Sequence, residues 1–155
     1  MKYALIGCGR IAVNHIKAVK NNNLELIALC DLNLDNIDLL LKKTEYKTNA
    51  PRYSDYKTMI DEHPEIELVA IATDSGMHAE IALYCIDNEI NVIVEKPMAM
   101  SMKDATEMIK RSEEKGVKIS VCHQNRFNMA VQEMRNAIDN GRFGKFSHGS
   151  INVRW

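Results

Sequence analysis

Two short motifs bring together residue types that can contact a phosphate and move a proton. The first is the segment GCGRIA at residues 7–12, which directly follows an apolar run at residues 3–6. The second is EKP at residues 95–97, which closes another apolar run much later in the chain. Glycines after a strand let backbone amides approach a phosphate, and a lysine at a strand end can present its amine to a ligand. Together the motifs predict a nucleotide-binding crevice that contains a proton-handling group.

The glycine motif has the spacing Gly-x-Gly-x-x-Ala. Gly7 allows the tight turn, Gly9 lets the backbone approach a pyrophosphate without an intervening Cβ, and Ala12 fills the third, close-packing position. We expect a helix over about residues 10–21, whose free N–H groups and positive dipole end point at the phosphates. The alternative is a plain strand–turn–helix that binds no ligand.

An acidic residue follows the second apolar run. The strand expected at residues 24–30 ends at Asp31, about 20 residues past the glycines, where a carboxylate can accept hydrogen bonds from adenosine ribose hydroxyls. An acid here favours NAD over NADP, because it would repel a 2′-phosphate, and Leu32 and Asn33 offer no cation to offset the repulsion. The alternative is an ordinary aspartate at a strand end.

Composition narrows the class of protein. The chain has 155 residues, enough for a domain with a real core, and its net charge is −1 with acids and bases interspersed, so we expect no nucleic-acid partner. No apolar run approaches the length of about 18 residues that a membrane span needs, and the strand at the N-terminus argues against a signal peptide. The scattered cysteines favour buried thiols in a reducing, cytoplasmic compartment over disulfides or metal ligands: Cys8, Cys30, Cys85 and Cys122.

Strand and helix patterns alternate along the chain, which predicts an α/β fold with a doubly wound parallel sheet of the Rossmann type. Strands are expected at 3–6, 24–30, near 52–53, and at 67–72, 91–94 and 117–122. Helices are expected over 10–21, 33–43, 55–62, 77–88, 102–115 and 127–140, with Asp55 and Ser101 as caps and Gly116 as a stop. Ligands of such sheets bind at the carboxyl ends of the strands.

Two further candidate groups fall at such strand ends. Residues 71–78 leave a strand and enter a helix, and their small and hydroxyl side chains can line the nicotinamide half of a cofactor. His78 lies in the first turn of that helix, where local capping or packing is the alternative to catalysis. Lys96 precedes Pro97, which restricts its backbone and helps aim the side chain into a cleft. At the mouth of an apolar strand the amine could be partly desolvated and help remove a substrate hydroxyl proton during hydride transfer. The alternative is a surface lysine.

The segments GCGRIA, ATDSGMH and EKPMAMS, in this order and spacing, resemble the glucose–fructose oxidoreductase/inositol dehydrogenase (Gfo/Idh/MocA) family over essentially the whole chain. Members are NAD(P)-dependent oxidoreductases that act mostly on sugars, polyols and their derivatives. The family's usual Ala-Thr-Pro is here Ala72-Thr73-Asp74, which leaves the stiffness of this loop open. The resemblance implies that Lys96 is the catalytic lysine beside the nicotinamide. It also implies a cofactor site of Gly7, Gly9, Arg10, Ile11, Ala12, Asp31, Thr73, His78, Glu95 and Lys96.

The segment QNRFN at residues 124–128 is similar to bacterial UDP-N-acetylglucosamine or UDP-N-acetylglucosaminuronate 3-dehydrogenases. It would leave the last strand and offer amides and a guanidinium to a sugar, with Gln124, Asn125, Arg126 and Asn128 as substrate-binding candidates. The alternative is capping by the asparagines and a structural ion pair for the arginine. We therefore expect an NAD-dependent dehydrogenase of a sugar or nucleotide-sugar CH–OH group. An inositol or other polyol dehydrogenase and a dinucleotide-binding module without catalysis stay open.

The segment GRFGK at residues 141–145 matches the crossing of this family into a second α/β domain, which covers the cleft and supplies a catalytic histidine. The resemblance thus implies an NAD-binding Rossmann domain at residues 1–122. Residues 123–155 would form a crossover helix and the first strand, at 146–155, of an incomplete substrate domain. The chain is then expected to be a truncated form of a protein that is a homo-oligomer at full length.

Overall fold

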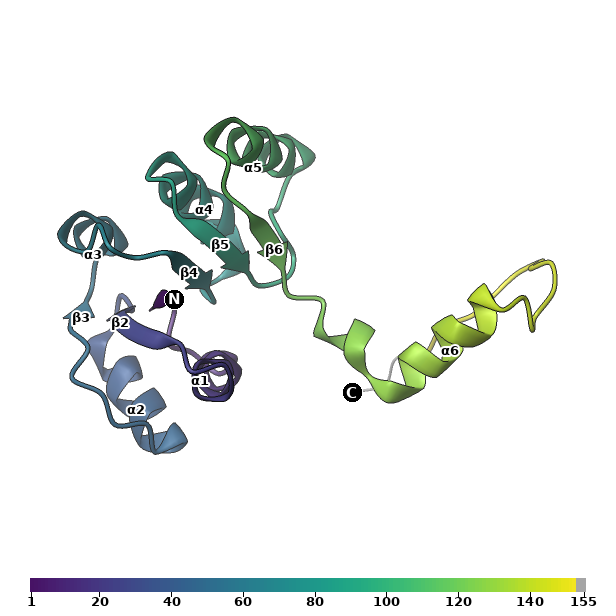
Figure 1. The fold of residues 1–155 in the computed structure, drawn as a ribbon, viewed down its shortest axis with the longest axis horizontal. Coiled ribbons are helices and arrows are strands. Elements are labelled where there is room, and N and C mark those ends of the chain that lie inside the picture. Colours follow the sequence, from purple (N-terminus) through teal and green to yellow (C-terminus); the bar gives the residue numbers. More distant parts are fainter. Residues whose placement is uncertain (153–155) are drawn as a thin grey trace. The chain divides into compact units, whose positions relative to one another are not determined.

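The structure, a computed structural model, describes residues 1–152 and contains one six-stranded sheet in the order β3-β2-β1-β4-β5-β6 (Figure 1). Every neighbouring pair of strands is parallel. This order places β1 and β4 side by side at the point where the winding reverses, so the expected doubly wound Rossmann sheet is confirmed. The strands are β1 (Lys2–Ile6), β2 (Glu25–Cys30), β3 (Arg52–Tyr53), β4 (Leu68–Ile71), β5 (Asn91–Val94) and β6 (Ile119–Val121).

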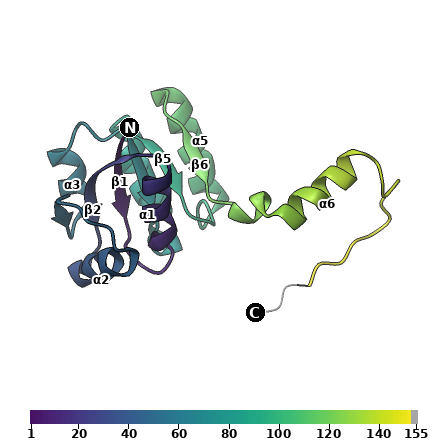
Figure 2. The ribbon, with the colours of Figure 1, turned by 60° about the horizontal axis from the view of Figure 1, so that its bottom comes forward.

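Helices cover both faces of the sheet. One face carries α1 and α2, and Figure 2 turns this side toward the viewer, whereas α3, α4 and α5 cover the opposite face (Figure 1). A short 3₁₀ turn, η1, leads into α4. These elements are α1 (Ala12–Asn21), α2 (Leu34–Thr44), α3 (Tyr56–Glu62), η1 (Ser75–Met77), α4 (His78–Asp87) and α5 (Met102–Lys115).

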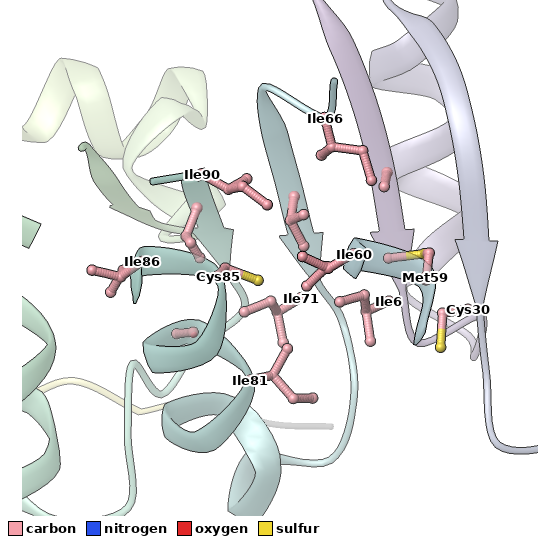
Figure 3. Close-up of a cluster of buried hydrophobic side chains, with 14 of the residues drawn as sticks. Ile6, Cys30, Met59, Ile60, Ile66, Ile71, Ile81, Cys85, Ile86 and Ile90 are labelled. Atoms are coloured by element: carbon pink, nitrogen blue, oxygen red, sulfur yellow. The ribbon is translucent and has the colours of Figure 1, made fainter. Parts of the chain in front are cut away.

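Each face has its own apolar core, because the strands are covered on both sides and alternate side chains point to opposite faces. On the side of α3 to α5, Ile71 packs toward Ile81 of α4, and Met59 lies near Ile6 (Figure 3). On the side of α1 and α2, the core includes Leu5 of β1 together with fully buried side chains from both helices. The two cores hold the strand ends in fixed register, which is what a site along that edge requires.

Side-chain caps define where three of the helices begin. Asn33 caps α2, Asp55 caps α3 and Ser101 caps α5, each by accepting a hydrogen bond from a backbone amide of the first turn. Helix α5 ends at Gly116, which has a φ of +69°. The sequence therefore predicted the two caps Asp55 and Ser101 and the stop at Gly116 correctly.

The chain from His123 onward forms a separate compact unit. Its described part contains the 3₁₀ turn η2 (Gln124–Phe127) and helix α6 (Met129–Asp139). The strand expected at 146–155 was wrong for residues 146–152, which are irregular, because a lone extended segment has no neighbour to pair its backbone groups. The rest of that expected strand, at Val153, Arg154 and Trp155, lies outside the described residues. Within residues 1–152, no helix combines the length and apolarity needed to cross a membrane.

Candidate functional site

The turn after β1 needs a glycine for two reasons. Gly7 has a φ of +90°, and a Cβ at this position would lie 2.5 Å from the carbonyl carbon of Ala72 and 2.6 Å from the amide nitrogen of Thr73. The sequence motif indicated the turn but not this close approach of the β1 end to the β4 end. Gly9 differs, because a Cβ there would meet nothing within 4 Å. Its backbone therefore borders open space, as a phosphate site requires.

Helix α1 begins beside this open space without a protein cap. Its N-cap residue, Ile11, makes no side-chain capping hydrogen bond, and the first turn contains no acidic residue. The amides and dipole at this end are therefore free of a competing carboxylate, unlike those of α2, α3 and α5. Ala12, the third position of the motif, is fully buried against the sheet. An anionic group such as a pyrophosphate fits the chemistry of this helix end.

A cavity of about 490 Å³ lies along the carboxyl ends of β1, β2 and β4. Its volume is typical of small-molecule sites. The cavity wall combines the glycine turn, the end of β2, the β3–α3 loop, the β4–η1 loop and one turn of α4. The lining residues are Ile6, Gly7, Gly9, Arg10, Ile11, Cys30, Asp31, Leu32, Asn36, Ser54, Asp55, Tyr56, Ala72, Thr73, Asp74, Met77 and Ile81.

The Asp31 carboxylate is oriented by three donors before any ligand is considered. It accepts hydrogen bonds from the Cys8 amide at 2.7 Å, the Asn33 amide at 2.9 Å and Asn36 Nδ2 at 2.9 Å. A carboxylate offers about four acceptor sites, so roughly one remains for a ribose hydroxyl. Arg10 lines the same cavity. It is a cation that the sequence-based preference for NAD over NADP did not include, because that preference considered only Leu32 and Asn33.

The thiols next to this cavity are buried, and burial favours their protonated form. Burial, reinforced by the nearby Asp31 carboxylate, raises the pKa of the Cys8 thiol to about 12. Burial, reinforced by Asp55, raises the pKa of Cys30 to about 12 as well. Because the thiolate is the reactive form, both residues act as small apolar groups under the glycine turn. All four cysteines are free thiols.

Lys96 follows β5 at the same edge of the sheet. The Glu95 amide donates to the Ile71 carbonyl at 3.0 Å, so the end of β5 lies beside the end of β4, whose next residues line the cavity. The Lys96 side chain itself is exposed and is not part of the cavity wall, and the Lys96–Pro97 peptide bond is cis. The partial desolvation expected for Lys96 in the whole protein therefore stays a prediction.

Two residues expected around the cofactor are buried and lie outside the cavity wall. His78 is 1% exposed, with Nδ1 2.8 Å from the Pro97 carbonyl and Nε2 3.1 Å from the Thr73 carbonyl. Glu95 is 7% exposed, and its carboxylate lies 3.2 Å from Nε2 of His15. Neither belongs to the cavity wall, so the packing alternative for His78 has direct support. The predicted residues that do line the cavity are Gly7, Gly9, Arg10, Ile11, Asp31 and Thr73.

A second polar cluster lies next to Lys96. Potential ligand atoms of His15, Glu95 and Cys122 lie within 4.8 Å of one another, close enough to hold a metal ion. Burial lowers the pKa of His15 against the opposing effect of Glu95, and burial followed by Glu95 raises the pKa of Cys122 to about 11. A neutral imidazole and a protonated thiol can both donate to the carboxylate, so hydrogen bonding accounts for this cluster without a metal.

The substrate-binding candidates belong to the second unit. Gln124, Asn125 and Arg126 lie in η2, and Asn128 precedes α6 without a side-chain capping bond. All four are exposed, and Arg126 forms no ion pair within the described chain. The structural alternatives of side-chain capping by Asn128 and an ion pair for Arg126 are thus not observed in residues 1–152. Contact of these side chains with a sugar stays a prediction.

Sequence reasoning missed several lining residues. Asn36 supports Asp31 from α2, and the signal for it was weak because five residues separate the two in sequence. Tyr56 and its neighbours at 54–55 come from the β3–α3 loop, and Ile81 comes from the core face of α4. Only the strand order brings these segments to the cavity, so the helical and strand periodicities alone could not identify them.

The strand order, the glycine turn and the acid at the end of β2 define a dinucleotide-binding α/β domain. Residues 1–123 match a family described as an oxidoreductase family with an NAD-binding Rossmann fold, Gfo/Idh/MocA. The chain belongs to this family, as the sequence resemblance indicated. The expectation of NAD as cofactor is confirmed at the level of the family.

Individual relatives extend well beyond this chain. Inositol 2-dehydrogenase from Salmonella paratyphi B is 26% identical over 94% of the chain, which spans only 43% of that relative's length. The WlbA dehydrogenase from Bordetella pertussis, solved with NADH and UDP-GlcNAcA, is 34% identical with a TM-score of 0.83, covering 93% of this chain and 43% of that one. An oxidoreductase from Agrobacterium radiobacter, solved with NAD⁺, L-tartaric acid and magnesium, is 26% identical with a TM-score of 0.82, covering 94% of this chain and 42% of that one.

Proposed function

We propose that the whole protein is an NAD-dependent dehydrogenase that oxidises a CH–OH group of a sugar, a polyol or a nucleotide sugar. The observation that carries this proposal is the position of Lys96. The lysine follows the end of β5, which lies beside the β4 end whose next residues line the cavity, in a chain of an NAD-binding oxidoreductase family. A domain that only bound a dinucleotide would not need an amine at this strand end.

Different residues along the carboxyl edge of the sheet have different roles in binding and catalysis. The turn at Gly7–Gly9 and the uncapped start of α1 hold the pyrophosphate, while Asp31 accepts a hydrogen bond from the adenosine ribose. Bound NAD supplies the hydride acceptor for the reaction. Lys96, as the neutral amine, then hydrogen-bonds the substrate hydroxyl and helps to take up its proton as the carbonyl forms, together with a residue outside this chain. Thr73 borders the nicotinamide half of the cavity.

For the substrate, we favour UDP-N-acetylglucosamine or its uronate, oxidised at the 3-position. Support comes from the segment at 124–128 and from the 34% identity to the WlbA dehydrogenase solved with UDP-GlcNAcA. Arg126 offers a guanidinium that suits a carboxylate or a phosphate of such a substrate. The second candidate is inositol or another polyol, which the Salmonella inositol 2-dehydrogenase supports.

The test is NADH formation by the whole protein with each substrate class. UDP-N-acetylglucosaminuronate, UDP-N-acetylglucosamine and myo-inositol are supplied separately with NAD, and the absorbance of NADH is followed. We expect turnover with a nucleotide sugar, and turnover with myo-inositol alone would favour the second candidate. Saturable NAD binding without NADH formation from sugars, polyols or nucleotide sugars would support the module that binds a dinucleotide without catalysis.

A further inference from the structure

Lys96 lies between two residues that are each held by a buried histidine. On its N-terminal side, Glu95 is held by His15 of α1. On its C-terminal side, the carbonyl of Pro97 is held by His78 of α4. Both histidines are buried, at 7% and 1% exposure, although Lys96 itself is exposed. The two helices lie on opposite faces of the sheet (Figure 1), so the segment around Lys96 is fixed from both sides.

The contact on the N-terminal side forms a matched chain of donors and acceptors. Burial raises the pKa of the Tyr3 hydroxyl, which stays protonated and can donate to Nδ1 of His15 at 3.3 Å. Nε2–H of His15 then donates to the Glu95 carboxylate at 3.2 Å. The carboxylate also faces the Cys122 thiol at the end of β6. Without His15, a buried carboxylate would lose its nitrogen donor, which is costly enough to displace the strand end.

The contact on the C-terminal side joins two loops. One His78 ring nitrogen lies 2.8 Å from the Pro97 carbonyl and the other lies 3.1 Å from the Thr73 carbonyl. Thr73 lines the cavity, whereas Pro97 directly follows the lysine. A neutral imidazole carries one N–H, so the ring donates to one of these two carbonyls in each tautomer. In either tautomer it packs between the cavity wall and the lysine segment. His15 also links the cavity to the lysine segment, because its helix α1 starts at the glycine turn and its partner Glu95 directly precedes the lysine.

We propose that His15 and His78 are positioning residues that fix Lys96 relative to the cofactor cavity. This inference rests on the proposed function, because it assigns the histidines a role through the proposed catalytic lysine. The lysine has a long, flexible side chain, and an exposed amine reaches one place reproducibly only if its backbone is fixed on both sides. A misplacement of about 1 Å can lower a rate by roughly 100-fold, so backbone support of this kind affects turnover directly.

The experiment compares three matched variants of the whole protein: His15→Phe, His78→Phe and the control His63→Phe. His63 is half-buried and hydrogen-bonded, to Tyr53 and Glu65, but it lies between α3 and the amino end of β4, whereas Lys96 follows the carboxyl end of β5. Each change is made in the wild-type and in the Lys96→Met background. For every protein we measure kcat, the KM for NAD, the dissociation constant for NADH and the unfolding midpoint.

We expect kcat to fall by roughly 10- to 100-fold in His15→Phe and His78→Phe, with the KM for NAD changed by less than about threefold. In the Lys96→Met background the same substitutions should lower kcat no further, since they act through the lysine. His63→Phe should leave kcat unchanged in both backgrounds. If a phenylalanine variant does not fold, His15→Gln and His78→Gln, which keep one donor, should retain more of kcat than Ala at the same position.

Unchanged kcat in His15→Phe and His78→Phe, or an equal loss in both backgrounds, would overturn the positioning role. Either result leaves the proposed function intact as long as Lys96→Met alone abolishes most turnover. If Lys96→Met is as active as the wild type, the proposed function fails instead, whatever the histidine variants do. The two failures are therefore distinguishable in one set of proteins.

Discussion

The two ends of the candidate site are built in different ways. At the glycine turn, the groups that would contact a ligand already have fixed orientations, as the three donors to Asp31 show. At the β5 end, the backbone around Lys96 is fixed by buried contacts, but the amine is exposed, and within residues 1–152 it takes part in no hydrogen bond or ion pair.

We therefore assign cofactor binding to the glycine-turn end of the site and the proton transfer to the β5 end. A preorganised carboxylate and an uncapped helix end can hold a dinucleotide with groups of residues 1–122 alone. An exposed amine, in contrast, is not shielded from water, and catalysis by such a group benefits from a site that excludes water. We therefore expect variants at the two ends to differ in whether they change NAD affinity or turnover.

The largest effect is expected for Lys96→Met in the whole protein. Methionine keeps the length of the side chain but cannot accept a proton, so kcat should fall by roughly 100- to 10,000-fold. The dissociation constant for NAD should change by less than threefold or so, because the lysine lies outside the cavity wall. Steady-state kinetics and NADH fluorescence titration measure the two quantities. Lys118→Met, at the other end of the sheet strands, is the control, and a comparable loss of kcat there would remove the special role of Lys96.

The opposite pattern is expected for Asp31→Ala. Loss of a charged acceptor should weaken NAD binding by roughly 10- to 100-fold, since hydrogen bonds to charged groups contribute about 1.5–3 kcal/mol. Calorimetric titration of NAD into the chain measures the change. Asp35→Ala, in the first turn of α2 but outside the cavity wall, should bind NAD as the wild type does. Unaltered affinity in Asp31→Ala would remove the ribose assignment.

The glycine turn allows stability and binding to be separated. Gly7→Ala should lower the free energy of unfolding by about 2 kcal/mol or more, because the left-handed backbone and the contact with Ala72 both resist a Cβ. Gly9→Ala has open space around it and should leave stability nearly unchanged while it weakens NAD binding. Urea unfolding monitored by circular dichroism tests both variants, and equal stability of the two would contradict the assigned difference.

A smaller effect is expected at the Asp55 cap of α3. Hydrogen bonds from the Thr58 amide and hydroxyl lower the pKa of Asp55 below its ordinary value of 3.8. Because the folded-state pKa lies below the unfolded one, this contribution is present at pH values above the unfolded pKa and disappears as the pH falls through the folded pKa. Asp55→Ala should lower the free energy of unfolding by about 1 kcal/mol at neutral pH. The difference from the wild type should shrink in strong acid, and a gap that stays constant with pH would contradict the assignment.

The sequence predicted the elements of the sheet well because their signals are local. The apolar runs, the caps Asp55 and Ser101 and the stop at Gly116 act within a few residues of where they stand. The burial of His78 against the Pro97 carbonyl was not predictable in this way, since it depends on which strands become neighbours. The support of Asp31 by Asn36 is local, but it depends on the path of the loop from β2 into α2, which the periodicities do not show. The strand expected near residue 146 failed for a related reason, because its alternating pattern requires a partner strand that residues 1–152 do not provide.

The most direct measurement is a crystal structure of the protein with NAD bound. We expect the adenosine ribose at Asp31, the pyrophosphate at the start of α1, and the nicotinamide close enough to Lys96 for the amine and the ring to contact one substrate molecule. A nicotinamide at another edge of the sheet, or an amine turned to bulk solvent on the far side of β5, would contradict the account.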